Sequence, residues 1–504
     1  MLQRAYGFLA TPKGGSATMT DLVVASNRGP VQFEVDDDGN LSSGRGAGGM
    51  VTALGPALAG QAGTWVAAAI SEGDRVAARR VARSGRLRTV ELAQGPVRLR
   101  SLVFDPREYQ GYYNRVANRT IWFLHHYLFD VPRHPRFDRG FRVAWQHYEA
   151  VNQAFATACD DEAGHGGGVF VQDYHLALVP AMLRQRRPDL RIAHFSHCPW
   201  ADPGYFLMLP GRVAGAILEG MLGADLLGFL VPRWARNFLH CCLEAGFGVD
   251  FERHTVRAGD GRTVRVRTYP LGVDGDALRE RAAQPDARAQ DRVVAELARG
   301  RRLIVRVDRL ELSKNILRGL ESYGMFLERN PRARGRVVHY ALTYPSRRDL
   351  PEYQAYTAEV KHLTDAINER FRTRTWEPVL LELRDNYPRA LAAMSAADVL
   401  IVNPVWDGMN LVAKEGPAIS RRDLVLVLSR NAGAADDLGP GALLINPFDT
   451  AELAETIATA LELPPDERAK RAARLREGAT ALPPQEWFAA QRQHLAEGPG
   501  QTPG

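Results

Sequence analysis

The segment GVFVQDYHLALVPAMLRQRRPDLRIAHFSH, residues 168–197, contains two short apolar runs on either side of an amphipathic stretch. The runs at 168–172 and 191–197 predict buried strands, and 174–186 predicts the helix that connects them. A strand, a helix and a second strand on this scale indicate a parallel sheet with crossover helices. The segment therefore predicts an α/β fold.

The same alternation continues along the rest of the chain. The segment RAGDGRTVRVRTY, residues 257–269, predicts a hairpin. Further strands are predicted at 22–26, 64–70, 225–230, 301–310, 336–344, 378–383, 398–404 and 424–429, with helices at 210–223, 351–370 and 387–396.

A domain boundary is predicted near PLGVD, residues 270–274, because the chain after it is polar and helical before a new series of strands begins. Two Rossmann-like domains with parallel sheets facing each other would place the strand carboxyl ends, and a ligand, in the cleft between them. The expected parts are a loose tail at 1–20, the two domains at 21–273 and 274–478, and at 479–504 a helix that packs back on the first domain, followed by a tail.

Composition excludes several classes of protein. The net charge is +6, and only five of the 64 basic residues are lysines, but no basic stripe with interleaved aromatic residues suggests nucleic-acid binding. No apolar run is long enough to span a membrane, and the first 20 residues do not resemble a signal peptide. The cysteines form no CxxC pair, so we expect neither a zinc site nor disulfides, and a cytoplasmic location with reduced thiols (Cys159, Cys198, Cys241 and Cys242).

The segment GRGAGGM, residues 44–50, matches a dinucleotide-binding fingerprint at Gly44, Gly46 and Gly49. Its context does not fit, since the preceding strand ends near Ser26 and a polar loop intervenes. The glycines more plausibly form a loop whose amides meet a phosphate or a sugar at a helix start.

Four polar side chains directly follow predicted strands. Arg28 lies in SNRGP, Asp173 and His175 lie in QDYHL, and His197 ends RIAHFSH. Ligands of α/β sheets bind at strand carboxyl ends, so these positions favour a site. Each also has an ordinary explanation: a surface turn for Arg28, a helix N-cap for Asp173, and core or rim packing for the histidines.

Two cations flank a second strand–loop–helix transition. In VDRLELSKNI, Arg309 ends a strand and Lys314 precedes a helix. Cations beside a helix N-terminus suit a diphosphate, because they neutralise its charge while the helix amides donate hydrogen bonds. Arg347, in YPSRRD, follows the next strand.

The most informative string is DGMNLVAKE, residues 407–415. Asp407 can cap the helix and also accept hydrogen bonds from sugar hydroxyls, and Gly408 lets the backbone approach a ligand. Glu415 follows eight residues later, about 80° round the helix, so it could reach a ribose while Asp407 reaches a hexose. A plain capped helix would also explain the two acids.

Taken together, these motifs resemble the trehalose-6-phosphate synthase family, which are retaining glycosyltransferases of the GT-B fold. The matching motifs occur in the family's order over about residues 22–450: SNR, AGG, YYN…W, DYH, the strand end at His197, R-x4-K, SR, DGMNLVAKE and NPFD at 446–449.

The resemblance implies a nucleotide-glucose donor and glucose 6-phosphate as acceptor. It places Asp173 at the acceptor sugar, His197 at the donor glucose, and Arg309 and Lys314 at the donor diphosphate. It places the acceptor phosphate at Arg28, Tyr113, Trp122 and Arg347. The other implied donor contacts are Gly48 and Gly49, then Asp407, Gly408, Met409 and Asn410 at the hexose, Leu411 and Val412 near the diphosphate, and Glu415 at the ribose.

The retaining class implies that the acceptor hydroxyl enters on the face the diphosphate leaves, and that the leaving phosphate takes its proton. Arg309 and Lys314 would stabilise the leaving charge, so no metal and no cofactor are expected. Partners are expected to be small molecules, with no nucleic acid and no membrane, and a homo-oligomer is left open. The alternatives are a sister transferase that uses glycerol phosphate or a cyclitol phosphate, and a non-catalytic regulatory homologue.

Two details of the implied site need structural explanation. Tyr113 and Trp122 are nine residues apart, which puts them on opposite sides of an ideal α-helix, so they converge only if the helix bends or ends between them. Glu311 and Leu312 stand where the family usually has Asp and Tyr. No departure from the family pattern removes an expected ligand.

The donor base is expected near RDNYP, residues 384–388, where Asp385 stands at a position that is often aromatic in the family. A carboxylate can accept from two N–H groups of guanine at once, but from only one of uracil. This slightly favours GDP-glucose over UDP-glucose as donor. Alternatively, Asp385 simply caps the following helix.

Overall fold

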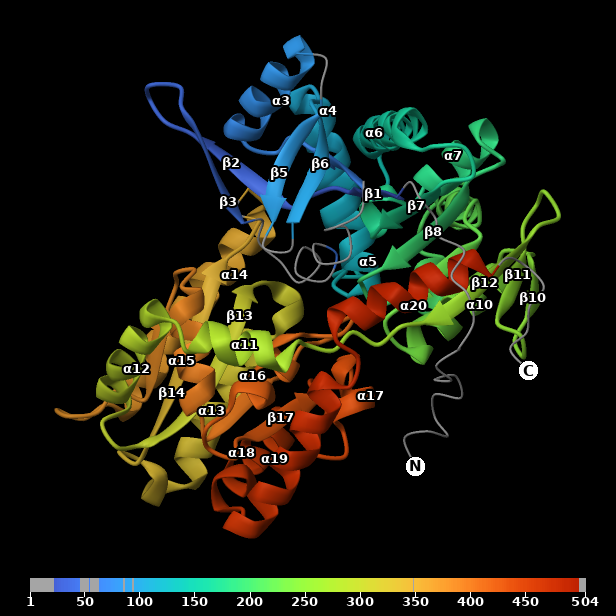
Figure 1. The fold of residues 1–504 in the computed structure, drawn as a ribbon. Coiled ribbons are helices and arrows are strands. Elements are labelled where there is room, and N and C mark those ends of the chain that lie inside the picture. The colour runs from blue at the N-terminus through green and yellow to red at the C-terminus, as the bar shows by residue number, and fades with distance from the viewer. Residues whose placement is uncertain are drawn as a thin grey trace.

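The computed structural model describes residues 22–45, 54, 63–84, 87–92, 95–347 and 349–497. These residues form two α/β domains, each built on its own sheet. Figure 1 shows the first domain, coloured blue to green, above the second, coloured yellow to red. The α/β fold with parallel sheets is confirmed.

The first domain is built on a ten-stranded sheet in the order β10-β11-β12-β9-β8-β7-β1-β4-β6-β5. Its central strands pair in parallel, and antiparallel pairs occur toward both edges. The strands are β1 (Leu22–Ser26), β4 (Thr64–Ala68), β5 (Arg88–Leu92), β6 (Gly95–Leu102), β7 (Gly168–Gln172), β8 (Arg191–Ser196), β9 (Leu226–Phe229), β10 (Gly248–Asp250), β11 (Thr255–Arg257) and β12 (Thr263–Thr268), and a separate hairpin pairs β2 (Val31–Val35) with β3 (Leu41–Arg45).

The helices of the first domain fill the connections between these strands. They are α3 (Glu72–Ser84), α4 (Pro106–Gln110), η1 (Gly111–Trp122), α5 (Phe123–His125), α6 (Arg139–Glu162), η2 (Tyr174–Leu176), α7 (Val179–Arg186), α8 (Pro203–Phe206), α9 (Gly211–Met221) and α10 (Pro232–Glu244). The single helix predicted at 174–186 is instead the short turn η2 followed by α7. Pro180 explains the break, because proline fits the first turn of a helix but lacks the N–H that an interior position needs.

The second domain has a six-stranded, wholly parallel sheet in the order β15-β14-β13-β16-β17-β18. The strands are β13 (Arg302–Leu310), β14 (Val337–Pro345), β15 (Val379–Glu382), β16 (Val399–Val402), β17 (Val425–Ser429) and β18 (Leu443–Ile445). The helices are α11 (Gly275–Ala282), α12 (Pro285–Ala298), η3 (Leu312–Lys314), α13 (Ile316–Arg329), η4 (Pro331–Ala333), α14 (Pro351–Phe371), α15 (Tyr387–Ala396), α16 (Val412–Ile419), α17 (Ala434–Leu438), α18 (Thr450–Glu462) and α19 (Pro465–Thr480).

The last helix, α20 (Pro484–Ala496), lies against β8 of the first domain (Figure 1). The indole Nε1 of Trp487 donates to the Tyr269 carbonyl oxygen at 3.1 Å, and the Phe488 ring packs 4.8 Å from that of Phe170. The chain thus crosses from the second domain back to the first.

The segment η1 is a π-helix, with hydrogen bonds that span five residues where an α-helix spans four. Such a helix has between four and five residues in each turn, so nine residues make about two full turns. Tyr113 and Trp122 therefore lie on the same face, although an α-helix would put them on opposite faces. They converge by the wider turn rather than by a bend or an end of the helix.

The helices in the described part of the chain include none that is both long and apolar enough to cross a membrane.

Candidate active site

The two cations predicted for a diphosphate sit at the carboxyl end of β13. The guanidinium of Arg309 forms an ion pair with Glu311, with 2.7 Å between Nη1 and Oε1. Lys314, in η3, has its Nζ 2.5 Å from Asp407 Oδ2. Burial would lower the pKa of Lys314, but Asp407 and Asp308 outweigh burial and raise it. Lys314 is therefore a firmly charged cation.

Asp407 does not cap the helix that follows it, which corrects the expectation from sequence. The helix α16 begins five residues later, and Asn410 Oδ1 accepts from the Ala413 amide at 3.2 Å. Asn410 has a positive φ of 78°, which turns its Nδ2 back to Asp407 Oδ2 at 3.1 Å. Asp407 is thus held by Lys314 and Asn410 in the loop before α16.

Gly408 is where the second domain touches the first. A methyl group at this position would lie 2.1 Å from the His197 carbonyl oxygen, so only glycine fits. On the other side, the indole Nε1 of Trp234 donates to the Gly408 carbonyl oxygen at 2.9 Å. The Asp407 loop is therefore seated directly on the end of β8.

Asp173 and His197 are joined at the ends of neighbouring strands, β7 and β8. Asp173 is the N-cap residue of η2, as the alternative expected, but its side chain makes no capping hydrogen bond there. Its Oδ1 instead accepts from the His197 amide at 3.1 Å. Burial raises the pKa of Asp173 to about 6 and lowers the pKa of His197 to about 3. The His197 ring is thus neutral, and its Nε2 lies 2.9 Å from Gln172 Oε1.

The residues predicted for the acceptor phosphate gather around the common face of η1. The Arg347 guanidinium lies over the Trp122 ring, 4.4 Å from its centre, and Arg309 lies over the same ring at 5.8 Å. Burial would raise the pKa of Tyr113, but Arg28 and Arg347 outweigh burial and lower it. Arg309 and Arg347 of the second domain and Arg28 of the first therefore surround the two aromatic rings.

The buried indole Nε1 of Trp122 has no hydrogen-bond partner among the residues that the structure describes. A buried donor without a partner is costly, and an anion bound in this cluster would satisfy it. Near it, His175 stacks on Tyr113 with 5.7 Å between ring centres, and its Nδ1 lies 3.9 Å from Asp173 Oδ2. His175 thus joins the strand-end cluster.

The remaining predicted donor contacts follow Asp407 into α16. Met409 is buried, Leu411 and Val412 are partly buried at the start of the helix, and Glu415 lies one turn further on. Burial raises the pKa of Glu415 to about 7. Gly48 and Gly49 lie outside the described residues.

Asp385 is exposed in the loop after β15. The N-cap of α15 is Asn386, whose Oδ1 accepts from the Arg389 amide at 3.1 Å. The capping alternative for Asp385 is therefore wrong, and its carboxylate is left to the solvent side of the loop.

Sequence reasoning missed two residues that contact the cluster of Arg347 and Trp122 around η1. Asn118, five residues after Tyr113 and on the same face of η1, accepts from Arg347 Nε at 3.0 Å and from the Tyr174 hydroxyl at 3.1 Å. His126 stacks on Trp122 with 3.6 Å between ring centres. Only knowing that this segment is a π-helix would have placed Asn118 on the face of Tyr113, and no sequence signal indicates a π-helix here.

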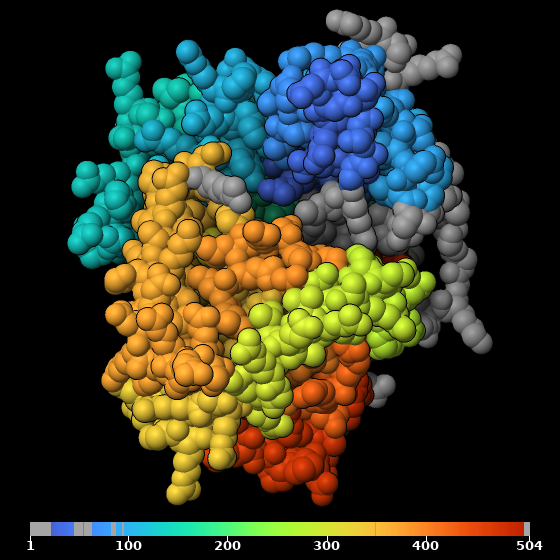
Figure 2. Space-filling view, turned by 90° about the vertical axis from the view of Figure 1, so that its left-hand side faces the viewer, coloured from blue at the N-terminus to red at the C-terminus, as the bar shows by residue number. Residues whose placement is uncertain are grey.

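The two domains also meet through α14. Arg119 of η1 forms an ion pair with Glu352, and the rings of Phe123 and Tyr353 lie 6.5 Å apart. Figure 2 shows the yellow-orange surface of α14 meeting the teal surface of the first domain. The acceptor cluster thus lies beside a direct contact between the domains.

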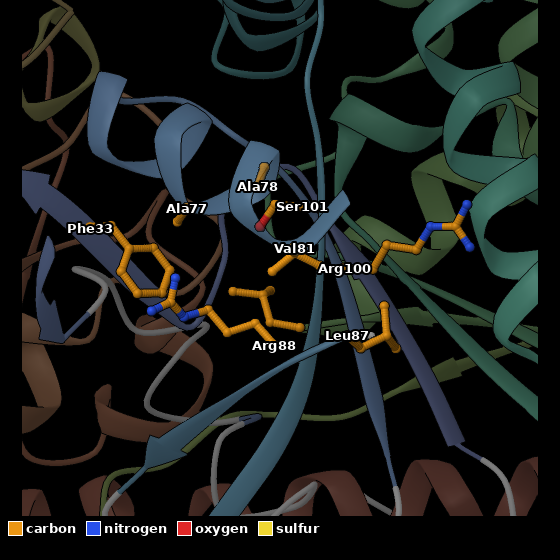
Figure 3. Close-up of a pocket in the computed structure, with 9 residues that line it drawn as sticks. Phe33, Ala77, Ala78, Val81, Leu87, Arg88, Arg100 and Ser101 are labelled. Atoms are coloured by element: carbon orange, nitrogen blue, oxygen red, sulfur yellow. The ribbon is translucent and has the colours of Figure 1, made fainter. Parts of the chain in front are cut away.

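A separate small pocket of about 260 Å³ lies between α3 and the strands β5 and β6 (Figure 3). Phe33 and Arg88 close one side of it, with the guanidinium 4.7 Å from the ring centre. It contains none of the predicted site residues. Within the described ranges, no group of three or more His, Cys, Asp or Glu residues could hold a metal ion.

Comparison with known proteins relates this chain to glycosyltransferases. The family model described as glycosyltransferase family 20 matches residues 20–497. A trehalose-6-phosphate synthase of Mycobacterium avium (strain 104) is 36% identical over 511 residues, which cover 96% of this chain and 98% of the relative. One of Mycobacterium tuberculosis (strain H37Rv) is 36% identical over 481 residues, 93% of each chain.

Solved structures resemble the whole two-domain chain. A structure from E. coli bound with UDP-2-fluoro glucose has a TM-score of 0.82 and 27% identity, covering 94% of this chain and 98% of the other. An α,α-trehalose-phosphate synthase (UDP-forming) from Burkholderia xenovorans, in complex with glucose-6-phosphate, has a TM-score of 0.80 and 28% identity, with 94% and 100% covered.

Proposed function

The chain belongs to glycosyltransferase family 20, and from that membership we propose that it transfers glucose from a nucleotide-glucose donor to glucose 6-phosphate. The product is α,α-trehalose 6-phosphate. The observation that carries the proposal is the cluster of Arg28, Arg347, Tyr113 and Trp122, whose indole N–H has no partner among the described residues, next to the cations Arg309 and Lys314. One cluster suits the acceptor phosphate and the other the donor diphosphate.

The proposed chemistry follows from these charges. Lys314 and Arg309 bind the diphosphate and stabilise the charge that develops on it as the glycosidic bond breaks. Asp407, Asn410 and neutral His197 hold the donor hexose. The acceptor hydroxyl enters on the same face, and the leaving phosphate takes its proton, so the configuration is retained without a protein nucleophile.

For the donor base, we propose GDP-glucose as the preferred donor, with UDP-glucose as the second candidate. Asp385 supports guanine, because its carboxylate is exposed and is not used as a helix cap. The Burkholderia relative, which is named as UDP-forming, supports uracil.

The test is an assay of the purified chain with glucose 6-phosphate and a panel of nucleotide-glucoses, in buffer with and without EDTA. We expect a product with the mass of trehalose 6-phosphate, an α,α linkage, and turnover that EDTA does not abolish. Turnover only with glycerol phosphate or a cyclitol phosphate would identify a sister transferase. No turnover with any pair would identify a non-catalytic homologue.

A further inference from the structure

Glu311 lies between the two cationic clusters and touches both. Its Oε1 forms an ion pair with Arg309 Nη1 at 2.7 Å and accepts a hydrogen bond from Arg347 Nη1 at 2.6 Å. The Ser346 hydroxyl donates to the same oxygen at 2.9 Å. The side chain is fully buried, with 0% of its surface exposed. One carboxylate oxygen thus links the cation expected at the donor to the cation expected at the acceptor.

The charge on Glu311 is secure. Burial would raise the pKa of this carboxyl, but Arg309 and Arg347 outweigh burial and lower the pKa to about 2. Without the carboxylate, the two guanidinium groups would repel each other, since each disfavours the charge of the other. Glu311 is therefore ionised at neutral pH, where it holds two like charges close together.

The two arginines differ in how firmly they are held. Arg347 also donates to Asn118 Oδ1 at 3.0 Å and to the Tyr353 hydroxyl at 3.2 Å, and its side chain is 9% exposed. Arg309 is 37% exposed, and Glu311 is its ion-pair partner among the described residues. The position of Arg309 therefore depends on Glu311, which in turn is fixed by Arg347.

We propose that Glu311 is a positioning residue that couples the donor and acceptor subsites by setting the place of Arg309 relative to Arg347. The proposal rests on the proposed function. When Arg347 is removed, Arg309 is the ion-pair partner that Glu311 keeps among the described residues, and the carboxylate draws it away from the diphosphate. Loss of an acceptor residue thus weakens donor binding through Glu311.

A double-mutant cycle on equilibrium binding tests this directly. The affinities for UDP and GDP are measured by calorimetry for the wild type, Arg347→Ala, Glu311→Gln and the double variant. We expect Arg347→Ala to weaken nucleoside diphosphate binding by about threefold more in the wild-type background than in Glu311→Gln, as interacting residues are non-additive. Equal losses in both backgrounds would overturn the proposal, as would a wild type that binds neither nucleotide.

Asp398→Asn supplies the matched control. Asp398 is another buried carboxylate of the same domain, which accepts from the Leu303 amide at 2.8 Å and pairs with Arg302 at 3.1 Å. In this background the Arg347→Ala effect should remain at its wild-type size. If Asp398→Asn also reduced it, the effect would reflect general loosening of the domain, and the proposal would be wrong.

Turnover gives a second readout, and Glu311→Asp covers the case in which Glu311→Gln fails to fold. Glu311→Gln should lower kcat by about tenfold to a hundredfold while changing both KM values less, because misplacement costs rate more than affinity. Glu311→Asp, which keeps the charge but is one methylene shorter, should recover part of that loss. If the wild type forms the product but the double-mutant cycle shows no coupling, only the role of Glu311 is wrong. If the cycle shows coupling but the wild type forms no product, only the proposed function is wrong.

Discussion

Lys314 Nζ and Asp407 Oδ2 lie 2.5 Å apart, although 93 residues separate them in the chain. The residues follow β13 and β16, which are neighbours in the second sheet. The pair joins the cation expected at the donor diphosphate to the carboxylate expected at the donor hexose. The two parts of a nucleotide-glucose that separate in the reaction would thus be bound by two side chains already in contact.

The first prediction is that Lys314→Ala lowers kcat by about 10²–10³ with the fold intact, because one electrostatic donor to the leaving group is lost. Steady-state kinetics and circular dichroism check it. Lys414→Met is the matched control, since the buried Lys414 has its Nζ also 2.5 Å from an aspartate, the partly buried Asp437, and its loss should affect stability more than kcat. A folded Lys314→Ala protein with near-normal turnover would contradict the assignment.

Arg347→Ala should raise the KM for glucose 6-phosphate by roughly 10- to 150-fold, the equivalent of a charge-assisted contact of about 1.5–3 kcal/mol. The KM for the donor should rise far less. Arg119→Ala is the control: it removes a cation of η1 that pairs with Glu352 in the domain contact beside the cluster, and it should leave both values nearly unchanged. A larger rise for the donor would assign Arg347 to the other subsite.

Glu415 should make the stability of the unliganded protein depend on pH. Its folded pKa of about 7 lies above the unfolded value of 4.5, so the folded state binds the extra proton and gains stability below pH 4.5 that is lost as the pH rises to 7. The Tm of the wild type should therefore fall relative to the Tm of Glu415→Gln as the pH rises from 5 to 8. Glu359→Gln, at an exposed site on α14, serves as control, and parallel Tm curves for Glu415→Gln would refute the prediction.

Gly408→Ala should abolish most activity because its methyl group would lie 2.1 Å from the His197 carbonyl oxygen. Since neither backbone can yield alone, we expect the two domains to move apart, which X-ray scattering would detect as a larger radius of gyration. Gly215→Ala, in the middle of α9 with nothing within 4 Å of the added group, should be neutral or stabilising. Wild-type turnover in Gly408→Ala would show that the contact opens during catalysis.

Asp385→Ala should reduce any preference for GDP-glucose over UDP-glucose when the two donors compete at equal concentration. The carboxylate can accept from both guanine N–H groups, and hydrogen bonds to a charged group contribute about 1.5–3 kcal/mol each at most. Asp385→Asn should retain part of the preference, because its amide still offers one acceptor. An unchanged preference in Asp385→Ala would show that another residue reads the base.

The strands could be predicted well because buried parallel strands are short apolar runs. The strands predicted at 301–310 and 424–429 are observed one residue shorter, at Arg302–Leu310 and Val425–Ser429, and the helix predicted at 387–396 has its predicted bounds. The strand-end candidates followed from the same logic, since carboxyl ends of neighbouring parallel strands share one edge. That is why Asp173 and His197, from β7 and β8, lie in contact.

Local competition between side chains was harder to predict. Neither aspartate caps its helix: Asn386, not Asp385, caps α15, and at α16 the N-cap is Leu411, while Asn410 rather than Asp407 accepts from the Ala413 amide. Before α16, the Asp407 carboxylate accepts a hydrogen bond from Lys314, which lies 93 residues away in the sequence, so no local pattern reveals the contact. Glu311 was visible only as a departure from the family pattern, because its contact is with Arg347, in the loop after the next strand, β14.

The wide turn of η1 makes the length of one segment as important as its composition. If evolution or an engineer deleted a single residue between Tyr113 and Trp122, the segment could return to α-helical bonding, and the two rings would then point about 80° apart. An alignment would still show every residue of the acceptor cluster, although Tyr113 and Trp122 would no longer lie on one face of the helix. Relatives of this chain are therefore best compared by counting residues across this segment before their side chains are compared.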